Sequence, residues 1–422
     1  MAMFIRKVDE DALARFDFLT GIGTIKIPGG TSAAGNINTL LTYTSPSAKY
    51  VRNSSGIYVS GTTLRTDYLA NGTALGLLVE GAFTNVLLRS QEFDNASWTK
   101  TDVTVTANAT AAPDGTTTAD LITEGTAGTA AIYQDGTATS ASVPVCGAIS
   151  FKPSANNNWV RVVLSSNDFV SGVNVWVNIS TGALGTVATR GTATSVGAQV
   201  VAAVNGFYRV EMWATFPAAV SGARIYFYSA SADNSTTRVN DAAYYAWQAS
   251  AGLGARPSSP VVTTTAAVTR AADDISILLS ALPFDATKGT LLAKVVPGSI
   301  ATGAKTPAAL WVDNNNYIRF LLLDASRQGN VVTSSSTVAA LSSGSGVVGT
   351  AYKGALSWKA NDFAFSADGG TIQTDTAGAL PTPTKLYLGS IGAGNMFNGW
   401  LQQLIYLPRD MSDAELVAWS TL

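Results

Sequence analysis

The sequence contains no histidine, and only one of its 422 residues is a cysteine, Cys146. Without histidine, the Ser-His-Asp and Cys-His nucleophilic systems, histidine-ligated zinc and the usual general base at neutral pH are excluded. A single cysteine cannot form an intrachain disulfide or a multi-thiolate metal site, and we expect Cys146 to be a small buried apolar residue. The sequence therefore predicts no metal and no cofactor, and it excludes most familiar hydrolase mechanisms.

Charge is also scarce. Charged residues make up 13% of the chain, and 26 basic against 28 acidic residues give a net charge of −2. This balance supplies no electrostatic footprint for nucleic acid or an anionic membrane, so neither is expected as a partner. No run of apolar residues is long enough to span a bilayer, and the N-terminal stretch is too short and too polar for a signal peptide. We expect no membrane insertion and no secretion signal.

The residues that are abundant favour strands. Hydrophobic residues make up 46% of the chain, and 39 glycines and 14 prolines are spread among tracts rich in Ser, Thr and Ala. Such tracts suit short strands and tight turns better than long helices. The composition therefore predicts an all-β protein, and the length favours more than one hydrophobic core.

Period-two patterns divide the chain. Residues 1–90 mix brief strand-like runs with turns and predict a small irregular segment. Residues 91–260 carry alternating runs that predict a first β-sandwich, and residues 261–274 read as an extended connector because they combine proline-flanked sequence with a threonine run. Residues 275–422 predict a second sandwich. Its expected strands include residues 291–296, 317–323, 354–358, 386–388 and 400–407.

Two helices are expected. Ser412 and Glu415 have capping-box spacing, which predicts a short C-terminal helix over residues 411–419. A weaker pattern predicts a helix over residues 9–16.

Three ordered stretches carry a further pattern. Residues 76–100 read GLLVEGAFTNVLLRSQEFDNASWTK, residues 205–210 read NGFYRV, and residues 245–273 contain YAWQA, RP and TRAAD. In this order they resemble a signature of the tail fibres, tailspikes and head fibres of tailed bacteriophages, in which a carbohydrate-module-like sandwich follows a GLLVEGARTN stretch. Phe83 stands where that signature commonly has arginine, and Phe207 where it has tryptophan.

The C-terminal part resembles a different family. The stretches YLGSI (387–391), FNGWLQQLIYLPR (397–409) and MSDAEL (411–416) are similar to the last strands and the closing turn of concanavalin A-like or laminin-G-like sandwiches. This resemblance implies a jelly-roll-like fold. It implies a function only loosely, because one fold hosts many functions.

Two groups of residues have the composition of a sugar site. Aromatic rings can stack on a pyranose face, while Asp and Asn side chains bind its hydroxyls; an inward aromatic ring beside an Asn-rich turn is the alternative reading. The Asp/Asn turns could also supply oxygen ligands for calcium, although no EF-hand spacing is present. The candidate residues are Trp311, Asp313, Asn314, Asn315, Asn316 and Tyr317 in one group, and Trp159 beside Asn156, Asn157 and Asn158 in the other.

A glycosidase needs two carboxylates about 5 to 9 Å apart on either side of one bond. The nearest sequence neighbours are Asp120 with Glu124, Asp233 with Asp241, and Asp273 with Asp274. None has an acid-dense, aromatic setting in the sequence. We interpret them as solvated loop charges and expect no enzyme.

The bacteriophage resemblance implies a virion structural protein that lies on the virion surface and projects its sandwiches toward a host glycan or surface protein. It also implies a homotrimer, and residues 1–90 are expected to dock to phage head or tail proteins. Two alternatives remain open: a pure scaffold subunit without a host ligand, and a polysaccharide depolymerase.

Overall fold

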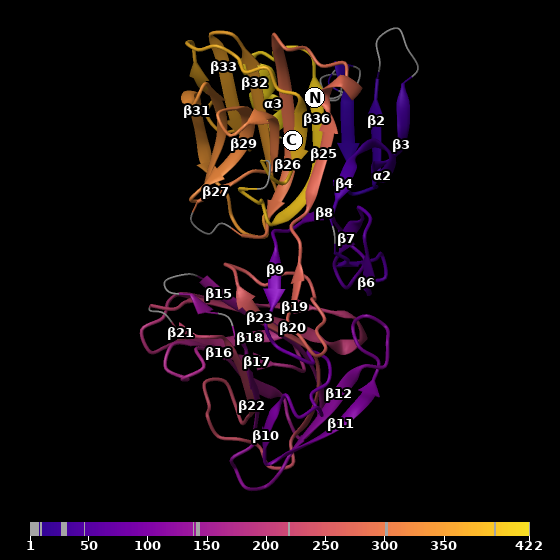
Figure 1. Ribbon diagram of the computed structural model, residues 1–422, viewed down its shortest axis with the longest axis vertical. Helices are drawn as coiled ribbons and strands as arrows, with labels where there is room; N and C mark the ends of the chain where they lie inside the picture. Colours follow the sequence, from indigo (N-terminus) through magenta and orange to yellow (C-terminus); the bar gives the residue numbers. More distant parts are fainter. Residues whose placement is uncertain are drawn as a thin grey trace.

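The protein consists of two stacked β-sandwich bodies that form an elongated molecule (Figure 1). The computed structural model describes residues 8, 11–26, 32–45, 47–137, 139–140, 144–217, 220–299, 303–391 and 394–421. Nearly all regular structure in these residues is antiparallel strand, which confirms the all-β prediction. Among them, no helix combines the length and apolar character that a membrane crossing requires.

The middle sandwich is the lower body in Figure 1 and consists of two six-stranded sheets. Alternate residues of each strand point into its core, as Val160, Val162 and Leu164 do, because strand side chains alternate between faces. In spatial order, one sheet is β10 (Thr99–Thr101), β13 (Ala131–Asp135), β22 (Arg224–Ala230), β16 (Trp159–Ser165), β17 (Gly172–Asn178) and β18 (Ala183–Arg190). The other is β11 (Val103–Thr110), β12 (Ala119–Glu124), β23 (Ala243–Leu253), β15 (Pro144–Ala155), β20 (Tyr208–Thr215) and β19 (Thr194–Ala202). A short pair, β14 (Thr139–Ser140) with β21 (Val220–Ser221), and the 3-10 turn η1 (Val204–Gly206) complete it.

The upper body packs a larger and a smaller sheet around a second core. The larger sheet runs β3 (Ala33–Asn36), β2 (Ile22–Ile25), β1 (Ala14–Asp17), β36 (Gly399–Leu407), β26 (Lys288–Pro297), β32 (Tyr352–Lys359), β33 (Asp362–Ala367) and β34 (Gln373–Asp375), with β8 (Ala74–Val79) on β36 and β7 (Thr66–Tyr68) on β8. The smaller sheet runs β31 (Ser336–Ser345), β30 (Ser326–Thr333), β29 (Asn316–Leu323), β28 (Ala308–Asp313), β35 (Lys385–Leu388), β25 (Asp274–Leu278) and β4 (Thr42–Thr44), with β27 (Ala304–Lys305) on β29. The upper body also contains the short helices α2 (Ile37–Leu40) and η2 (Leu279–Ala281).

Within the first 90 residues, strands β1, β2, β3, β4, β7 and β8 are part of this upper body, which corrects the separate segment predicted from the sequence. Val86 and Leu87 already pack into the core of the middle sandwich. Strand β1 pairs with β36 at the other end of the chain, and β4 pairs with β25. Ala14 and Phe16 of β1 are buried in the upper core, because strands this short cannot bury their apolar face alone. The middle sandwich is therefore inserted into the upper body between β8 and β25.

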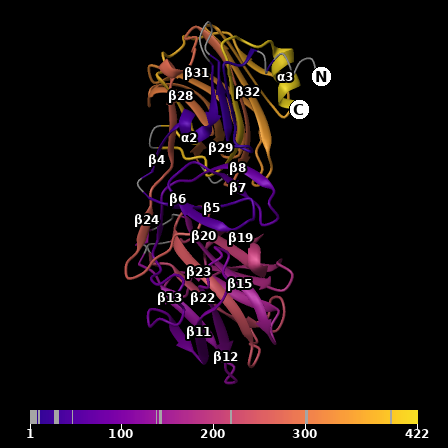
Figure 2. The same ribbon diagram turned by 90° about the vertical axis from the view of Figure 1, so that its right-hand side faces the viewer.

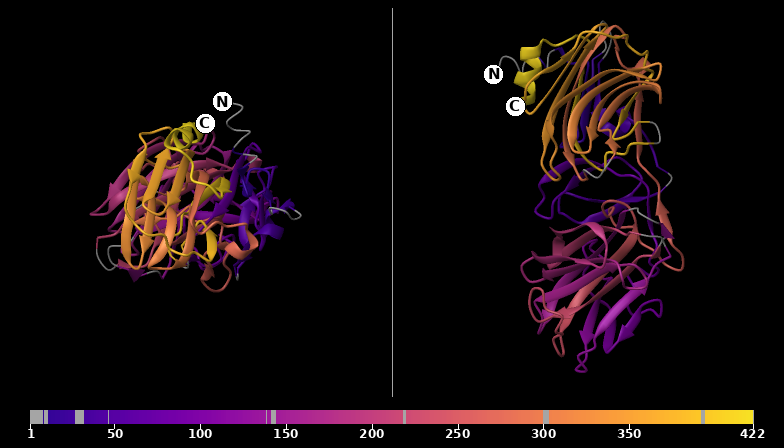
Figure 3. Two further views of the ribbon diagram at one scale, coloured as in Figure 1. Left: turned by 90° about the horizontal axis from the view of Figure 1, so that it is seen from above. Right: turned by 90° about the vertical axis from the view of Figure 1, so that its left-hand side faces the viewer.

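The C-terminal helix is confirmed as α3 (Asp413–Thr421), which covers the outer face of the larger sheet beside β32 and β33 (Figure 3). The Ser412 hydroxyl accepts from the Glu415 backbone N–H, and the Glu415 carboxylate accepts from the Ser412 backbone N–H, as a capping box requires. Of the expected helix over residues 9–16, Asp11 is helical, but the prediction is wrong for residues 14–16. Ala14 to Phe16 belong to β1, because pairing with β36 overrides the weak local helix pattern, and residues 9 and 10 lie outside the described residues.

Candidate functional site

Two antiparallel segments carry the chain between the bodies. Strand β9 (Phe83–Asn85) leads into the middle sandwich and pairs with β24 (Val268–Arg270), which leads out of it. The hairpin of β5 (Lys49–Arg52) and β6 (Tyr58–Gly61) lies beside them between the two bodies (Figure 2). Tyr58 of this hairpin stacks on Trp247 of β23, with 6.1 Å between ring centroids. The bodies are thus joined by paired backbone and by buried side chains.

A buried carboxylate organises this region. Both Asp273 oxygens are satisfied: the Tyr43 hydroxyl donates to one at 2.8 Å, and the Lys49 ammonium and the Glu80 backbone N–H donate to the other at 2.6 and 2.8 Å. Arg270 adds a charge contact at 3.9 Å. The Asp273 and Lys49 side chains are 0% and 4% exposed, so this ion pair is fully desolvated. Burial and the neighbouring Asp273 charge raise the pKa of Tyr43, which keeps its hydroxyl a donor.

Glu80 forms the second half of the same network. Its carboxylate accepts from the Ser259 backbone N–H at 2.7 Å and the Ser259 hydroxyl at 2.8 Å, and it faces Arg270 at 4.0 Å. Burial alone would raise the pKa of Glu80, but the charges of Arg270 and Lys49 and the two bonds from Ser259 outweigh burial and lower it. Glu80 therefore stays ionised. We call Tyr43, Lys49, Glu80, Ser259, Arg270 and Asp273 the joint cluster.

The joint cluster explains the spacing of the sequence pattern described above. Glu80 belongs to the GLLVEG stretch, and Arg270 and Asp273 belong to TRAAD. The Glu80 backbone N–H donates to the Asp273 carboxylate although the two residues are 193 positions apart in the sequence. Asn85 of the first stretch donates its side-chain amide to the Val261 and Ala249 carbonyls. The ordered stretches thus converge on one buried connection between the bodies. The interpretation of Asp273 as a solvated loop charge was wrong, because its partners are distant in sequence.

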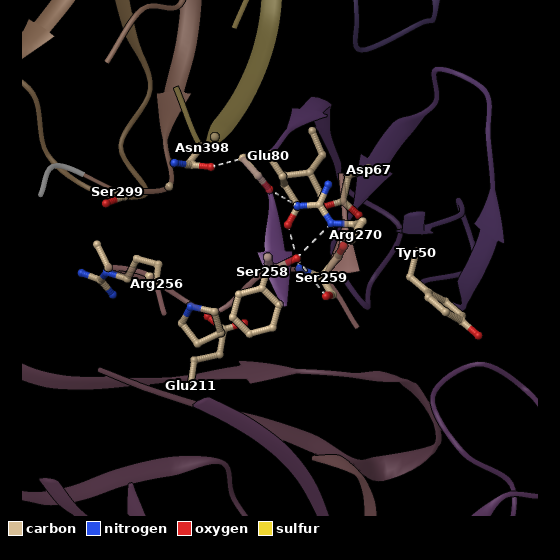
Figure 4. Close-up of a pocket in the computed structure, with 18 of the residues that line it drawn as sticks. Tyr50, Asp67, Glu80, Glu211, Arg256, Ser258, Ser259, Arg270, Ser299 and Asn398 are labelled. Atoms are coloured by element: carbon tan, nitrogen blue, oxygen red, sulfur yellow. Dashed lines mark hydrogen bonds and ion pairs between the residues drawn. The ribbon is translucent and has the colours of Figure 1, made fainter. Parts of the chain in front are cut away.

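A cavity of about 280 Å³ lies at this connection and is lined by residues of both bodies (Figure 4). On the upper side, Arg52 donates to both oxygens of Asp67, which also accepts from the Trp400 indole N–H at 2.8 Å. On the lower side, Arg209 contacts Glu211 at 3.0 Å. Arg52 with Asp67, and Arg209 with Glu211, are therefore paired within the lining, whereas the Arg256 guanidinium lies 3.3 Å from the Trp213 ring. Labelled in Figure 4 are Tyr50, Asp67, Glu80, Glu211, Arg256, Ser258, Ser259, Arg270, Ser299 and Asn398.

The first predicted sugar group lies on the hairpin of β28 and β29. Trp311 and Tyr317 are cross-strand partners on the outer face of the smaller sheet, and Trp311 packs edge-on against Tyr387 at 5.4 Å. The Asp313 carboxylate accepts from the Asn315 backbone N–H and the Asn316 amide, so these residues close their own turn. The structure thus brings the two rings to one face of the sheet. The turn of residues 313–316, which includes Asn314, lies at the edge of that face. Ligand binding by this group stays a prediction.

The second predicted group forms the wall of a pocket. Trp159, Asn156, Asn157 and Asn158 line a hollow of about 680 Å³ together with Ser180 and Ser231. Asn157 is buried, and its side-chain amide nitrogen has no hydrogen-bond partner among the described residues. The pocket brings an aromatic ring and amides together as the sequence predicts. Sugar binding there also stays a prediction.

Within the described residues, no three Cys, Asp or Glu side chains are grouped so that they could hold a metal ion. Cys146 is buried as expected, and burial raises the pKa of its thiol. Asp120 and Glu124 were interpreted as solvated charges, but both are 1% exposed in β12. Asp120 accepts from the Phe93 and Asn108 backbone N–H groups, and Glu124 accepts from Ser229 and Tyr244. Both carboxylates are structural.

The buried carboxylates of β12 predict a pH dependence of the middle sandwich. Burial raises the pKa of Asp120 to about 6, against about 4 in an unfolded chain, and raises that of Glu124 as well. The folded state then binds more protons between these values, so stability is gained as the pH falls through 6 and lost as it rises. We expect thermal unfolding of this sandwich to show about 1.3 kcal/mol more stability near pH 5 than near pH 7 from Asp120, with a further contribution of the same sign from Glu124.

The Asp120→Asn variant is the matched control for this measurement. Asparagine cannot titrate, so the variant should lose most of the pH dependence between the two conditions. Stability that stays level or decreases toward pH 5 in the unaltered chain would contradict the assignment.

Comparisons with known proteins give fold likenesses only. No protein-family model matches the chain, and no curated protein matches it. Among solved structures, a carbohydrate-binding module of the Ruminococcus gnavus IT-sialidase, bound to α2,3-sialyllactose, is 14% identical, with 33% of this chain and 84% of that chain covered and a TM-score of 0.29. Domain 4 of a Geobacillus stearothermophilus extracellular arabinanase, in complex with arabinotriose, is 14% identical, with 35% and 73% covered and a TM-score of 0.30. At these scores the likenesses assign neither a ligand nor an activity to this chain.

Proposed function

We propose that the chain is a structural subunit of a tailed-phage particle, a fibre, spike or decoration subunit, that carries two β-sandwiches outward and adheres to glycan on the host surface. The joint cluster is the observation that supports this proposal most directly. The stretches that resemble phage fibre proteins supply Glu80, Arg270 and Asp273, whose ion pairs with one another and with Lys49 hold the two connecting segments together. In this proposal, those residues stabilise the connection between the two sandwiches mechanically.

The connection suits a subunit that must transmit force. Two paired segments cross between the bodies, and a single free linker would leave the bodies to move independently. A buried ion pair holds one geometry, since separating its charges leaves each without a partner. Weak individual sites on such a subunit would gain strength from the many copies on one particle. A homotrimer and docking to head or tail proteins remain part of the proposal.

Adhesion is favoured over depolymerisation by the state of the acids. A glycosidase needs a protonated carboxyl group of raised pKa beside the scissile bond. Glu80, which lines the cavity at the joint, has a lowered pKa and is ionised. Asp120 has a raised pKa, but it is 1% exposed and bonded to backbone N–H groups, so a glycan cannot reach it. Burial also raises the pKa of Asp274, but Asp274 does not line the cavity at the joint. The scaffold alternative differs from the proposal only in lacking a host ligand.

The location of the chain in a particle tests the proposal. Particles released from the bacterium that encodes the chain would be purified, and antibodies against the chain would be used for gold labelling in electron microscopy. We expect label on the outer surface of intact particles. Label confined to unassembled material, or particles without the chain by mass spectrometry, would overturn the virion assignment.

A further inference from the structure

The outer face of one middle-sandwich sheet carries arginines and aromatic rings. In β16, β17 and β22 the residues next to the core positions point outward, and register places Arg161 between Trp176 and Tyr228. The Arg161 guanidinium lies 5.0 Å from the Trp176 ring and 5.5 Å from the Tyr228 ring. At the other end of the face, the Arg190 guanidinium lies 3.7 Å from the Phe169 ring. These strands belong to the lower body in Figure 1.

The arginines of this face differ in the groups they contact. Arg224 is neutralised by Asp135, which it contacts through two hydrogen bonds of 2.6 and 2.9 Å. Arg161 has a different environment: it donates to the Tyr228 hydroxyl and to the Asn174 amide oxygen, and both are neutral. The Arg161 Nε is buried and has no hydrogen-bond partner among the described residues. Arg161 thus donates only to neutral groups, while its Nε and the flanking Trp176 and Tyr228 rings are themselves buried.

The Arg190 guanidinium has an environment similar to that of Arg161. Its Nε donates to the Phe169 carbonyl, again a neutral group. Burial and the charges of Arg161 and Arg224 lower the pKa of Arg190, so each of these two guanidinium groups repels that of Arg190. A protein of net charge −2 has therefore gathered like charges on one sheet face. A bound anion would relieve this repulsion, since a guanidinium matches a carboxylate through two parallel hydrogen bonds.

The aromatic rings on the same face indicate which kind of molecule bears the negatively charged group. Tyr133 and Tyr226 are half-buried neighbours with 5.9 Å between centroids, and Phe169 lies 5.1 Å from Tyr226. Half-exposed aromatic rings offer flat apolar area for the faces of sugar rings. A twofold contact of this face with itself is disfavoured, because it would bring arginine against arginine.

We propose that this face, centred on Arg161 and Arg190, binds an acidic glycan whose sugars carry carboxylate groups. This inference rests on the proposed adhesive function and names the ligand class and the sheet that binds it. It places the site on the middle sandwich, whereas the Trp311 group lies on the upper body. The arginines hold the carboxylate, and the rings support the sugars beside it.

The test uses the full chain on an array of glycans that bear carboxylate, sulfate or phosphate groups, together with neutral glycans and carboxyl-reduced forms of the acidic ones. We expect binding to carboxylated glycans and loss of binding to their carboxyl-reduced forms. Arg161→Ala and Arg190→Ala should each weaken binding about ten- to hundred-fold, because each removes a charge-assisted hydrogen bond. Arg161→Lys keeps the charge without the fork and should retain part of the affinity, which separates lost binding from lost folding.

Lys359→Ala, which removes an exposed positive charge from the upper body, is the matched control and should bind like the unaltered chain. Binding only to neutral glycans, or loss of binding with Trp311→Ala and not with the arginine variants, would overturn this inference while leaving adhesion in place. Binding only to phosphate- or sulfate-bearing glycans, or self-association through this face, would also overturn it. Particle-bound chain that binds no glycan at all would overturn both this inference and the adhesive part of the proposed function.

Discussion

Replacing Asp273 with asparagine is expected to lower the free energy of unfolding of the upper body by about 3 to 5 kcal/mol. The substitution keeps the shape of the side chain but removes the charge that faces Lys49 at 2.6 Å. Lys49 is 4% exposed and cannot regain water without opening the joint, so its charge would remain buried without its partner. Denaturant unfolding followed by tryptophan fluorescence measures the loss.

The exposed ion pair of Lys359 with Asp362 provides the control. Its side chains are 47% and 55% exposed, and water screens the attraction in such pairs, so they contribute little to stability. Asp362→Asn should therefore leave the upper body almost unchanged. Equal losses for the two variants would mean that burial of the joint cluster does not govern its energetics.

The second large effect is expected at Gly76. Strand β8 passes close to β36 at this residue, which has φ of +118°, and a Cβ there would lie 2.3 Å from the Leu401 carbonyl oxygen. Gly76→Ala must therefore push β8 away from β36 in addition to straining its own backbone. We expect a loss of roughly 3 kcal/mol in upper-body stability, the sum of backbone strain and overpacking.

Gly128 separates these two contributions. It also has a positive φ, +69°, but a Cβ there would have no neighbour within 4 Å. Gly128→Ala should cost about 1 kcal/mol, the backbone strain alone. If the two alanine variants lose the same stability, the close approach of β8 to β36 is not the reason for the glycine in the GLLVEG stretch.

Local patterns allowed most strands to be placed from the sequence. The alternation at residues 159–164 became β16, and that at residues 400–407 became β36, because the period-two pattern is a property of neighbouring residues. The Asp313–Asn316 turn was predicted for the same reason. The capping box at Ser412 placed the start of α3 within one residue.

Pairing between distant strands could not be predicted in this way. Nothing near Ala14 indicates that β1 will lie beside β36, and the local pattern there favoured a helix. This contact decides whether the first 90 residues are a separate unit. It also makes the middle sandwich an insertion, which the sequence order of the predicted domains did not show.

The candidate sites also differ in whether their residues are neighbours in the sequence. The Trp311 and Trp159 groups were found because their members are sequence neighbours. The joint cluster unites residues from positions 43 to 273, and the arginine face unites β16, β18 and β22, so composition gave no sign of either. The ordered pair of stretches around Glu80 and Arg270 was the one available signal, since stretches that recur together can be in contact.

Adhesion without cleavage is the central claim, and one measurement tests it most directly. Purified chain would be incubated with envelope polysaccharide of the host, and the same samples analysed for bound protein and for polymer length by size-exclusion chromatography with light scattering. We predict saturable binding to a polymer whose length does not change. A polymer that shortens with time would show a depolymerase, and a polymer that binds no protein would show a scaffold; either result contradicts the account.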